Sequence, residues 1–83
     1  MTLNPPLRVH NTDVIGISPE TLSIDIIVYI VGDPKTLSKN EALLQVDRET
    51  QKACDYLALE GFVPMNGKMW RIRKVGILQS HPK

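Results

Sequence analysis

The sequence of 83 residues predicts an α+β fold, in which one long helix packs on a mostly antiparallel sheet of three or four strands. Two patterns support this prediction. Residues 21–31 alternate aliphatic side chains as a strand does, and residues 39–60 repeat them at the spacing of a helix. The expected order is strand, strand, helix, short strand, strand. We expect residues 1–83 to form a single domain with flexible ends at about 1–6 and 79–83.

The first part of the chain is expected to be an irregular lead-in followed by a weak strand. Pro5 and Pro6 have no backbone donors, so residues 2–6 favour unpaired chain. Residues 7–17 are partly apolar but are interrupted at 11–13 by a turn or a bulge. Residues 18–20 then predict a turn into the main strand, and antiparallel pairing of the first two strands is the simplest result.

The main strand has one fully aliphatic face, formed by Leu22, Ile24, Ile26, Val28 and Ile30. Its other face begins polar at Ser23 and Asp25 and ends apolar at Val31. We therefore expect other parts of the protein to bury both faces of this strand only toward its C-terminal end. A buried Asp25 would have a raised pKa, whereas a solvated or edge-facing aspartate is the simpler interpretation.

A helix is predicted to follow, from about residue 39 to residue 60. Ser38 and Glu41 have the spacing of a capping box, and Gly61 suits a left-handed position at the helix end. Leu44 and Leu59 fall off the apolar stripe, so they are either ordinary exposed leucines or contacts for a partner. The expected buried stripe consists of Leu43, Val46, Thr50, Ala53, Cys54 and Leu57.

The C-terminal part is expected to form a hairpin. Residues 62–64 read as a short strand, residues 66–67 (Asn-Gly) as a tight turn, and residues 68–78 as the return strand. Trp70 and Ile72 alternate with Met69, Arg71 and Arg73. A bulge at 74–76 would move Val75 and Ile77 to the core side.

Catalytic chemistry is not expected from this composition. The two histidines, His10 and His81, lie near the chain ends, and no Cys/His pair has the spacing of zinc ligands. No glycine-rich phosphate loop is present, so we expect no metal, no cofactor and no enzymatic activity. The single cysteine, Cys54, is interpreted as a core residue, and a reactive thiol is the alternative.

The chain shows neither a signal peptide nor an apolar run long enough to span a membrane. We therefore expect no membrane insertion and a location in the cytoplasm, or in a virion if the chain is encoded by a phage.

Basic side chains gather at the C-terminal strand, while acidic ones gather on the helix. The candidate partner-binding residues are Lys68, Arg71, Arg73 and Lys74. Next to Trp70, they could hold a nucleic-acid backbone, or they could be the solvated face of an amphipathic strand. Acidic and basic surfaces on one subunit could also pair head to tail between copies.

The layout of residues 23–77 resembles the small tail-terminator or tail-completion proteins of bacteriophages. The matching segments are SIDIIVYIV, the helix NEALLQVDRETQKACDYL, EGF at its end and the closing strand MWRIRKVGI. The resemblance implies a non-enzymatic protein that forms rings at the end of a phage tail. The chain lacks the leading helix of that family. A second likeness, through SIDIIVYI and EGFVP, is to the cytoplasmic C-terminal domain of small-conductance mechanosensitive channels, which is also an oligomer-forming α+β module.

These patterns favour a non-enzymatic assembly or interaction protein that acts as an oligomer, with a phage tail or neck component as one form of it. A small nucleic-acid-binding protein using the basic strand is the alternative. A small inhibitor or regulator of a host protein is a third class, since such proteins need only a shaped surface.

Overall fold

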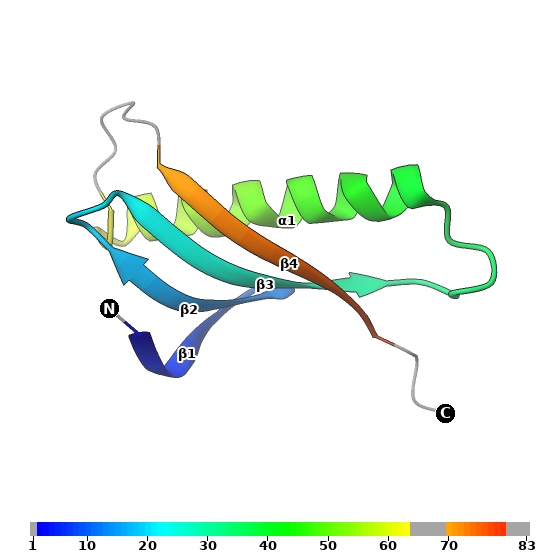
Figure 1. The fold of residues 1–83 in the computed structure, drawn as a ribbon, viewed down its shortest axis with the longest axis horizontal. Coiled ribbons are helices and arrows are strands. Elements are labelled where there is room, and N and C mark those ends of the chain that lie inside the picture. Colours follow the sequence, from blue (N-terminus) through cyan, green and yellow to red (C-terminus); the bar gives the residue numbers. More distant parts are fainter. Residues whose placement is uncertain (1, 64–69, 80–83) are drawn as a thin grey trace.

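The computed structural model describes residues 2–63 and 70–79. It contains one helix and a four-stranded sheet, which confirms the predicted α+β fold (Figure 1). The elements in chain order are β1 (Thr2–Val9), β2 (Thr12–Ser18), β3 (Ser23–Val31), α1 (Lys39–Leu59) and β4 (Arg71–Gln79).

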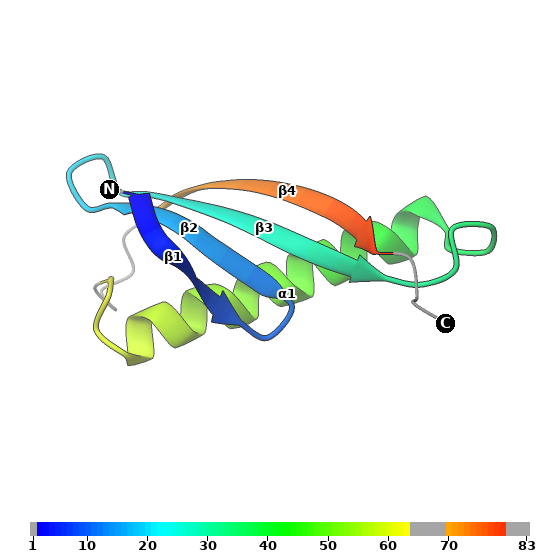
Figure 2. The ribbon, with the colours of Figure 1, turned by 90° about the horizontal axis from the view of Figure 1, so that it is seen from below.

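The strands lie in the sheet in their order along the chain, with β1 and β4 at the two edges (Figure 2). β1 and β2 pair antiparallel, as do β2 and β3, whereas β3 and β4 pair parallel. The mostly antiparallel sheet is therefore confirmed. The parallel pair follows from the helix, which carries the chain back along the sheet so that β4 starts beside the start of β3.

The distribution of strands around the helix differs from the prediction. Three strands precede α1 and one follows it, because the turn at residues 10–11 divides the first segment into the hairpin β1–β2. Residues 62–63 form a bend after the helix rather than a short strand. The predicted tight turn at 66–67 lies outside the described residues.

The core lies between α1 and one face of the sheet. Ile24, Ile26 and Val28 of β3 are buried, as expected from the strand pattern, and they lie in one cluster with Ala53 and Leu57 of the helix. Figure 1 shows α1 crossing that side of the sheet. The predicted packing of the long helix on the sheet is thus confirmed.

Leu22 was expected on the same buried face, and that prediction is wrong. The residue lies in the β2–β3 turn with a φ of 52°, one position before β3 begins. Its backbone N–H donates to the carbonyl of Pro19 at 3.3 Å, and its carbonyl accepts from the N–H of Arg71 at 2.7 Å. The turn hydrogen bond takes Leu22 out of the strand, and the carbonyl instead anchors the start of β4.

The cap at Ser38 and the left-handed Gly61 match the prediction, but the buried stripe does not match fully. Ser38 Oγ accepts from the N–H of Glu41 at 3.1 Å, and Gly61 adopts a φ of 84°. Leu43, expected in the buried stripe, is exposed, whereas Glu49, which is not part of that stripe, is buried. Thr50, Ala53 and Leu57 are buried as expected, while Val46 and Cys54 are partly buried.

Two polar side chains explain how the helix is seated. Glu49 accepts a hydrogen bond from the N–H of Asn11 at 3.2 Å, in the β1–β2 turn. Gln45 bonds both backbone groups of Val31, accepting from the N–H at 2.9 Å and donating to the carbonyl at 2.7 Å. These bonds fix the first half of α1 to the sheet through polar groups, which is why its buried stripe is less apolar than expected.

The N-terminal lead-in is part of the sheet rather than an unpaired arm. β1 contains Pro5 and Pro6, and its register against β2 shifts between Thr2 and Leu7. The prolines interrupt the ladder because they supply no N–H, yet the residues on either side still pair.

The bulge predicted at residues 74–76 is absent. β4 pairs with β3 residue by residue, from Arg71 opposite Ser23 to Gln79 opposite Val31. Trp70 and Ile72 therefore face the core as expected. Val75 and Ile77, however, remain on the face of the sheet turned away from α1, here called the open face.

Candidate functional site

The four basic residues singled out in the sequence do not form one surface. Lys68 lies outside the described residues. Arg71 and Arg73 are exposed on the open face, whereas Lys74 points to the helix side, where its Nζ lies 3.6 Å from Asp47 Oδ1. The alternation of side chains along β4 separates them, so a continuous basic strip is not present in the described part of β4.

Arg73 forms an ion pair within the sheet. Its Nε lies 2.6 Å from Asp25 Oδ1 and its Nη2 lies 2.8 Å from Asp25 Oδ2, a bidentate arrangement between directly opposed residues of β3 and β4. The hydrogen bonds from the guanidinium lower the pKa of Asp25 below its usual value. Asp25 is therefore a paired carboxylate, and neither of its sequence interpretations described that state.

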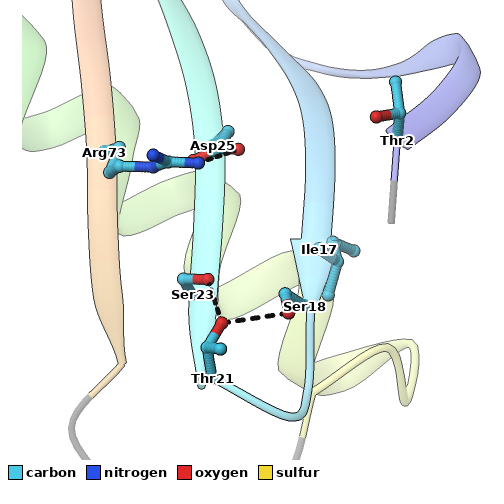
Figure 3. Close-up of a pocket in the computed structure, with 7 residues that line it drawn as sticks. All are labelled: Thr2, Ile17, Ser18, Thr21, Ser23, Asp25 and Arg73. Atoms are coloured by element: carbon cyan, nitrogen blue, oxygen red, sulfur yellow. Dashed lines mark hydrogen bonds and ion pairs between the residues drawn. The ribbon is translucent and has the colours of Figure 1, made fainter.

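A polar hollow lies beside this ion pair, at the end of the sheet that carries the β2–β3 turn (Figure 3). Thr21 Oγ1 donates to Ser18 Oγ at 2.9 Å and shares a hydrogen bond with Ser23 Oγ at 2.6 Å. A neighbouring hollow is lined by Thr21, Ser23, Arg71 and Arg73. Hydroxyls next to guanidinium groups suit a phosphate or carboxylate, although Asp25 already occupies Arg73.

A second polar network lies on the open face, across the first three strands. Arg8 of β1 places its Nε 3.0 Å from Asp13 Oδ1 and its guanidinium carbon 4.8 Å from the centre of the Tyr29 ring. The Tyr29 hydroxyl donates to Asp13 Oδ2 at 2.7 Å, and this hydrogen bond raises the pKa of Tyr29. These contacts join one polar side chain from each of β1, β2 and β3.

Beyond Arg73, the open face along β4 presents the apolar side chains of Val75 and Ile77. Ile27 and Val75 are opposed in the β3–β4 register, and Ile77 lies opposite Tyr29. Val31, at the end of β3, is also exposed, so the cover expected over this end of the strand is absent from the described part of the structure.

β4 is the most exposed strand of the sheet. The exposed fractions of Val75, Ile77 and Leu78 are 59%, 43% and 39%. The helix packs mainly on β3, β2 and β1. Its side chains reach β4 at Lys74 and Gly76, and every residue of β4 except Ile72 is exposed. An edge strand that exposes several large apolar side chains is a typical site of association with another chain.

Gly76 marks the place where β4 comes close to the helix. A Cβ atom there would lie 2.9 Å from Ile30 Cδ1 and 3.2 Å from Val46 Cγ2. A larger residue would push these side chains apart. The glycine therefore allows the middle of β4 to approach both β3 and α1.

The remaining candidate groups show little reactive chemistry. Burial raises the pKa of the half-buried Cys54 thiol, in agreement with its interpretation as a packing residue. Among the described residues, no group of three or more His, Cys, Asp or Glu side chains is arranged to hold a metal ion. In the same residues, no helix has both the length and the apolar character needed to cross a membrane.

Sequence reasoning missed the contacts that join distant segments. The pair Asp25–Arg73 and the bonds of Gln45 and Glu49 connect residues that no local pattern relates.

Comparisons of the chain with models of protein families, with curated proteins and with solved structures each gave no match.

Proposed function

We propose that this protein is a non-enzymatic assembly protein that works as an oligomer and associates through β4. The observation that carries the proposal is the exposure of Val75, Ile77 and Leu78 on one edge strand. Water contact with these side chains is unfavourable, and an added strand would cover them and pair the open edge at the same time.

The contact surface is apolar rather than charged. Head-to-tail pairing of an acidic helix with a basic strand was one expectation from the sequence, but Arg73 and Lys74 already pair with Asp25 and Asp47 of the same chain. We therefore expect association to depend weakly on salt, because screening acts mainly on exposed charges.

The test is size-exclusion chromatography with light scattering over a concentration series at low and high salt. We expect an oligomer whose population rises with concentration, and a monomer for Val75→Glu, which would place a charge in the contact. Leu59→Glu is the matched control, because Leu59 is an exposed leucine at the last position of α1 and is not part of β4. A strictly monomeric wild-type protein at high concentration would contradict the proposal.

The assignment to a phage particle is the narrower form of this proposal. It is supported by the resemblance in layout to tail-terminator and tail-completion proteins, which also act as assemblies. Genes for head and tail proteins next to the coding sequence would support it, and a neighbourhood of unrelated metabolic genes would weigh against it.

Nucleic-acid binding is the second candidate, and the hollow lined by Thr21, Ser23, Arg71 and Arg73 is the observation that favours it. A gel-shift assay at low salt tests it with Arg71→Ala, which should weaken binding. Lys74→Ala is the matched control, since Lys74 lies on the opposite face of β4. The absence of any shift at low salt would remove this candidate.

A further inference from the structure

We propose that the partner of β4 is a second copy of this chain, paired antiparallel to it with Val75 on a two-fold axis. The two four-stranded sheets then form one continuous sheet, with both helices on the same side. This inference rests on the proposed function and specifies its partner and its register.

The backbone of β4 shows which groups are open at the edge. The N–H of Arg71 donates to the carbonyl of Leu22, beside β3. Along a strand, the backbone groups of alternate residues point to opposite sides. Residues 71, 73, 75, 77 and 79 therefore point their backbone groups toward β3, and the outward set is Ile72, Lys74, Gly76 and Leu78.

The outward residues are symmetric about Val75, and this symmetry selects one register. With Val75 on the axis, Lys74 pairs with Gly76 of the second copy and Ile72 pairs with Leu78 of the second copy. Every outward N–H and C=O of the described strand then has a partner. A register centred on Gly76 places Ile72 opposite residue 80, beyond β4, and one centred on Lys74 opposes two lysines.

The side chains on the open face agree with the same register. Val75 meets Val75 of the second copy, Arg73 lies opposite Ile77, and Arg71 lies opposite Gln79. Like charges are thus not opposed in the described strand. The two Arg71 residues are eight positions apart along the pair, about 26 Å, which exceeds a Debye length of about 8 Å at physiological salt.

The charge of β4 also permits two copies to meet. Each Arg73 remains bonded to Asp25 and each Lys74 remains close to Asp47, so two of the three described cations of the strand have a neutralising neighbour in their own chain. A strand of unpaired cations would repel its copy. Because these ion pairs neutralise most of its charge, β4 can instead pair with β4 of a second copy.

Disulfide trapping in solution tests the register. Cys54 is the only cysteine, so Cys54→Ala gives a background without thiols. In this background, Val75→Cys should form a covalent dimer under mild oxidation, because residues opposed at a non-hydrogen-bonded position have Cα atoms about 4.5 Å apart, within disulfide range.

Ile77→Cys in the same background is the matched control, because Ile77 lies on the same face and is also exposed. Its two copies would be four positions apart, about 13 Å, so cross-linking should be slower by on the order of tenfold or more. The double variant Arg73→Cys with Ile77→Cys should restore rapid cross-linking, since these two positions are opposed across the axis.

Light scattering on the same samples separates the possible failures. If the protein is dimeric but Ile77→Cys cross-links as fast as Val75→Cys, the register is wrong and the proposed oligomer stands. If every sample is monomeric, both the register and the proposed function are wrong. Rapid trapping of Val75→Cys and of the double variant, slow trapping of Ile77→Cys and a dimer mass without oxidation support both.

Discussion

Removal of the Leu57 side chain should destabilise the protein strongly, because this residue anchors the helix to the sheet. Leu57 has an exposed fraction of 0% and lies in the core cluster with Ile24 and Ile26. Leu57→Ala removes apolar contacts and leaves a cavity that the neighbouring side chains fill only in part.

The expected loss is large compared with the total stability. A buried leucine replaced by alanine costs about 2–5 kcal/mol. A chain of 83 residues is expected to have a free energy of unfolding of roughly 4–12 kcal/mol. Since 1 kcal/mol corresponds to a shift in Tm of about 4–8 °C at this size, Leu57→Ala should lower the Tm by about 8 °C or more.

Leu59→Ala is the matched control for this experiment. It makes the same chemical change two positions away on the same helix, but Leu59 has an exposed fraction of 75%. We expect its effect to stay within about 0.5 kcal/mol, as for most surface substitutions. The change in intrinsic helix propensity is alike in the two variants, so the difference between them reports burial.

The assay is equilibrium unfolding in urea at one fixed protein concentration, followed by far-UV circular dichroism and by the fluorescence of the single tryptophan, Trp70. A fixed concentration is needed because self-association would itself add to the apparent stability. Equal losses for Leu57→Ala and Leu59→Ala, or a larger loss for Leu59→Ala, would show that the assigned helix face is wrong.

Three further outcomes follow from the described contacts. Ile26→Asp should unfold the domain, because an unpaired charge in the core costs several kcal/mol. Arg73→Ala should leave the stability nearly unchanged, because its ion pair with Asp25 is exposed to solvent. Circular dichroism compares the two variants, and the reverse ranking would mean that the strand register is wrong. Ser38→Ala should cost about 1 kcal/mol in urea unfolding, since the helix loses its cap, and no change would show that the cap contributes nothing. The pKa of Asp25 is lowered in the folded state, so its stabilising effect is complete above the ordinary aspartate pKa of about 3.9 and is lost as the pH falls through the folded pKa. Asp25→Asn should therefore reduce the loss of stability at acidic pH in a stability–pH profile. An unchanged acidic part of the profile would refute the role of the Asp25–Arg73 pair.

The elements with a strong local pattern were predicted well. The alternation in residues 21–31 and the capped helical pattern in residues 39–60 agree with β3 and α1 to within one or two residues. The reason is physical: a strand buried on one face needs a period of two, and a helix with one buried face needs a period near 3.6. Such periods are visible in the sequence alone.

In segments with a weak sequence pattern, the structure was determined by pairing with a neighbouring strand. Residues 2–6 join the sheet because β2 offers a partner, even though Pro5 and Pro6 interrupt the ladder. Val75 and Ile77 stay on the open face because β4 follows the register of β3 without a bulge. In both cases the decisive contact is to a residue distant in sequence.

For the candidate site too, the sequence predicted which residues are involved but not their contacts. The sequence identified Arg71, Arg73 and Lys74 as a basic cluster, but it could not show that two of them have acidic neighbours in the same chain. The exposure of Val75 and Ile77 likewise depends on the tertiary structure, because the register of β4 against β3 keeps both on the open face.

The order of apolar and polar residues thus determined by itself that this chain forms one long helix against a sheet, because local periodicity reflects which face is removed from water. Only the tertiary structure decided the parallel pairing of β4, the partners of its charged side chains and the exposure of Val75. Those outcomes depend on which segments far apart in the sequence pair with each other. The free energy of such pairing produces no periodic pattern in the sequence of either segment.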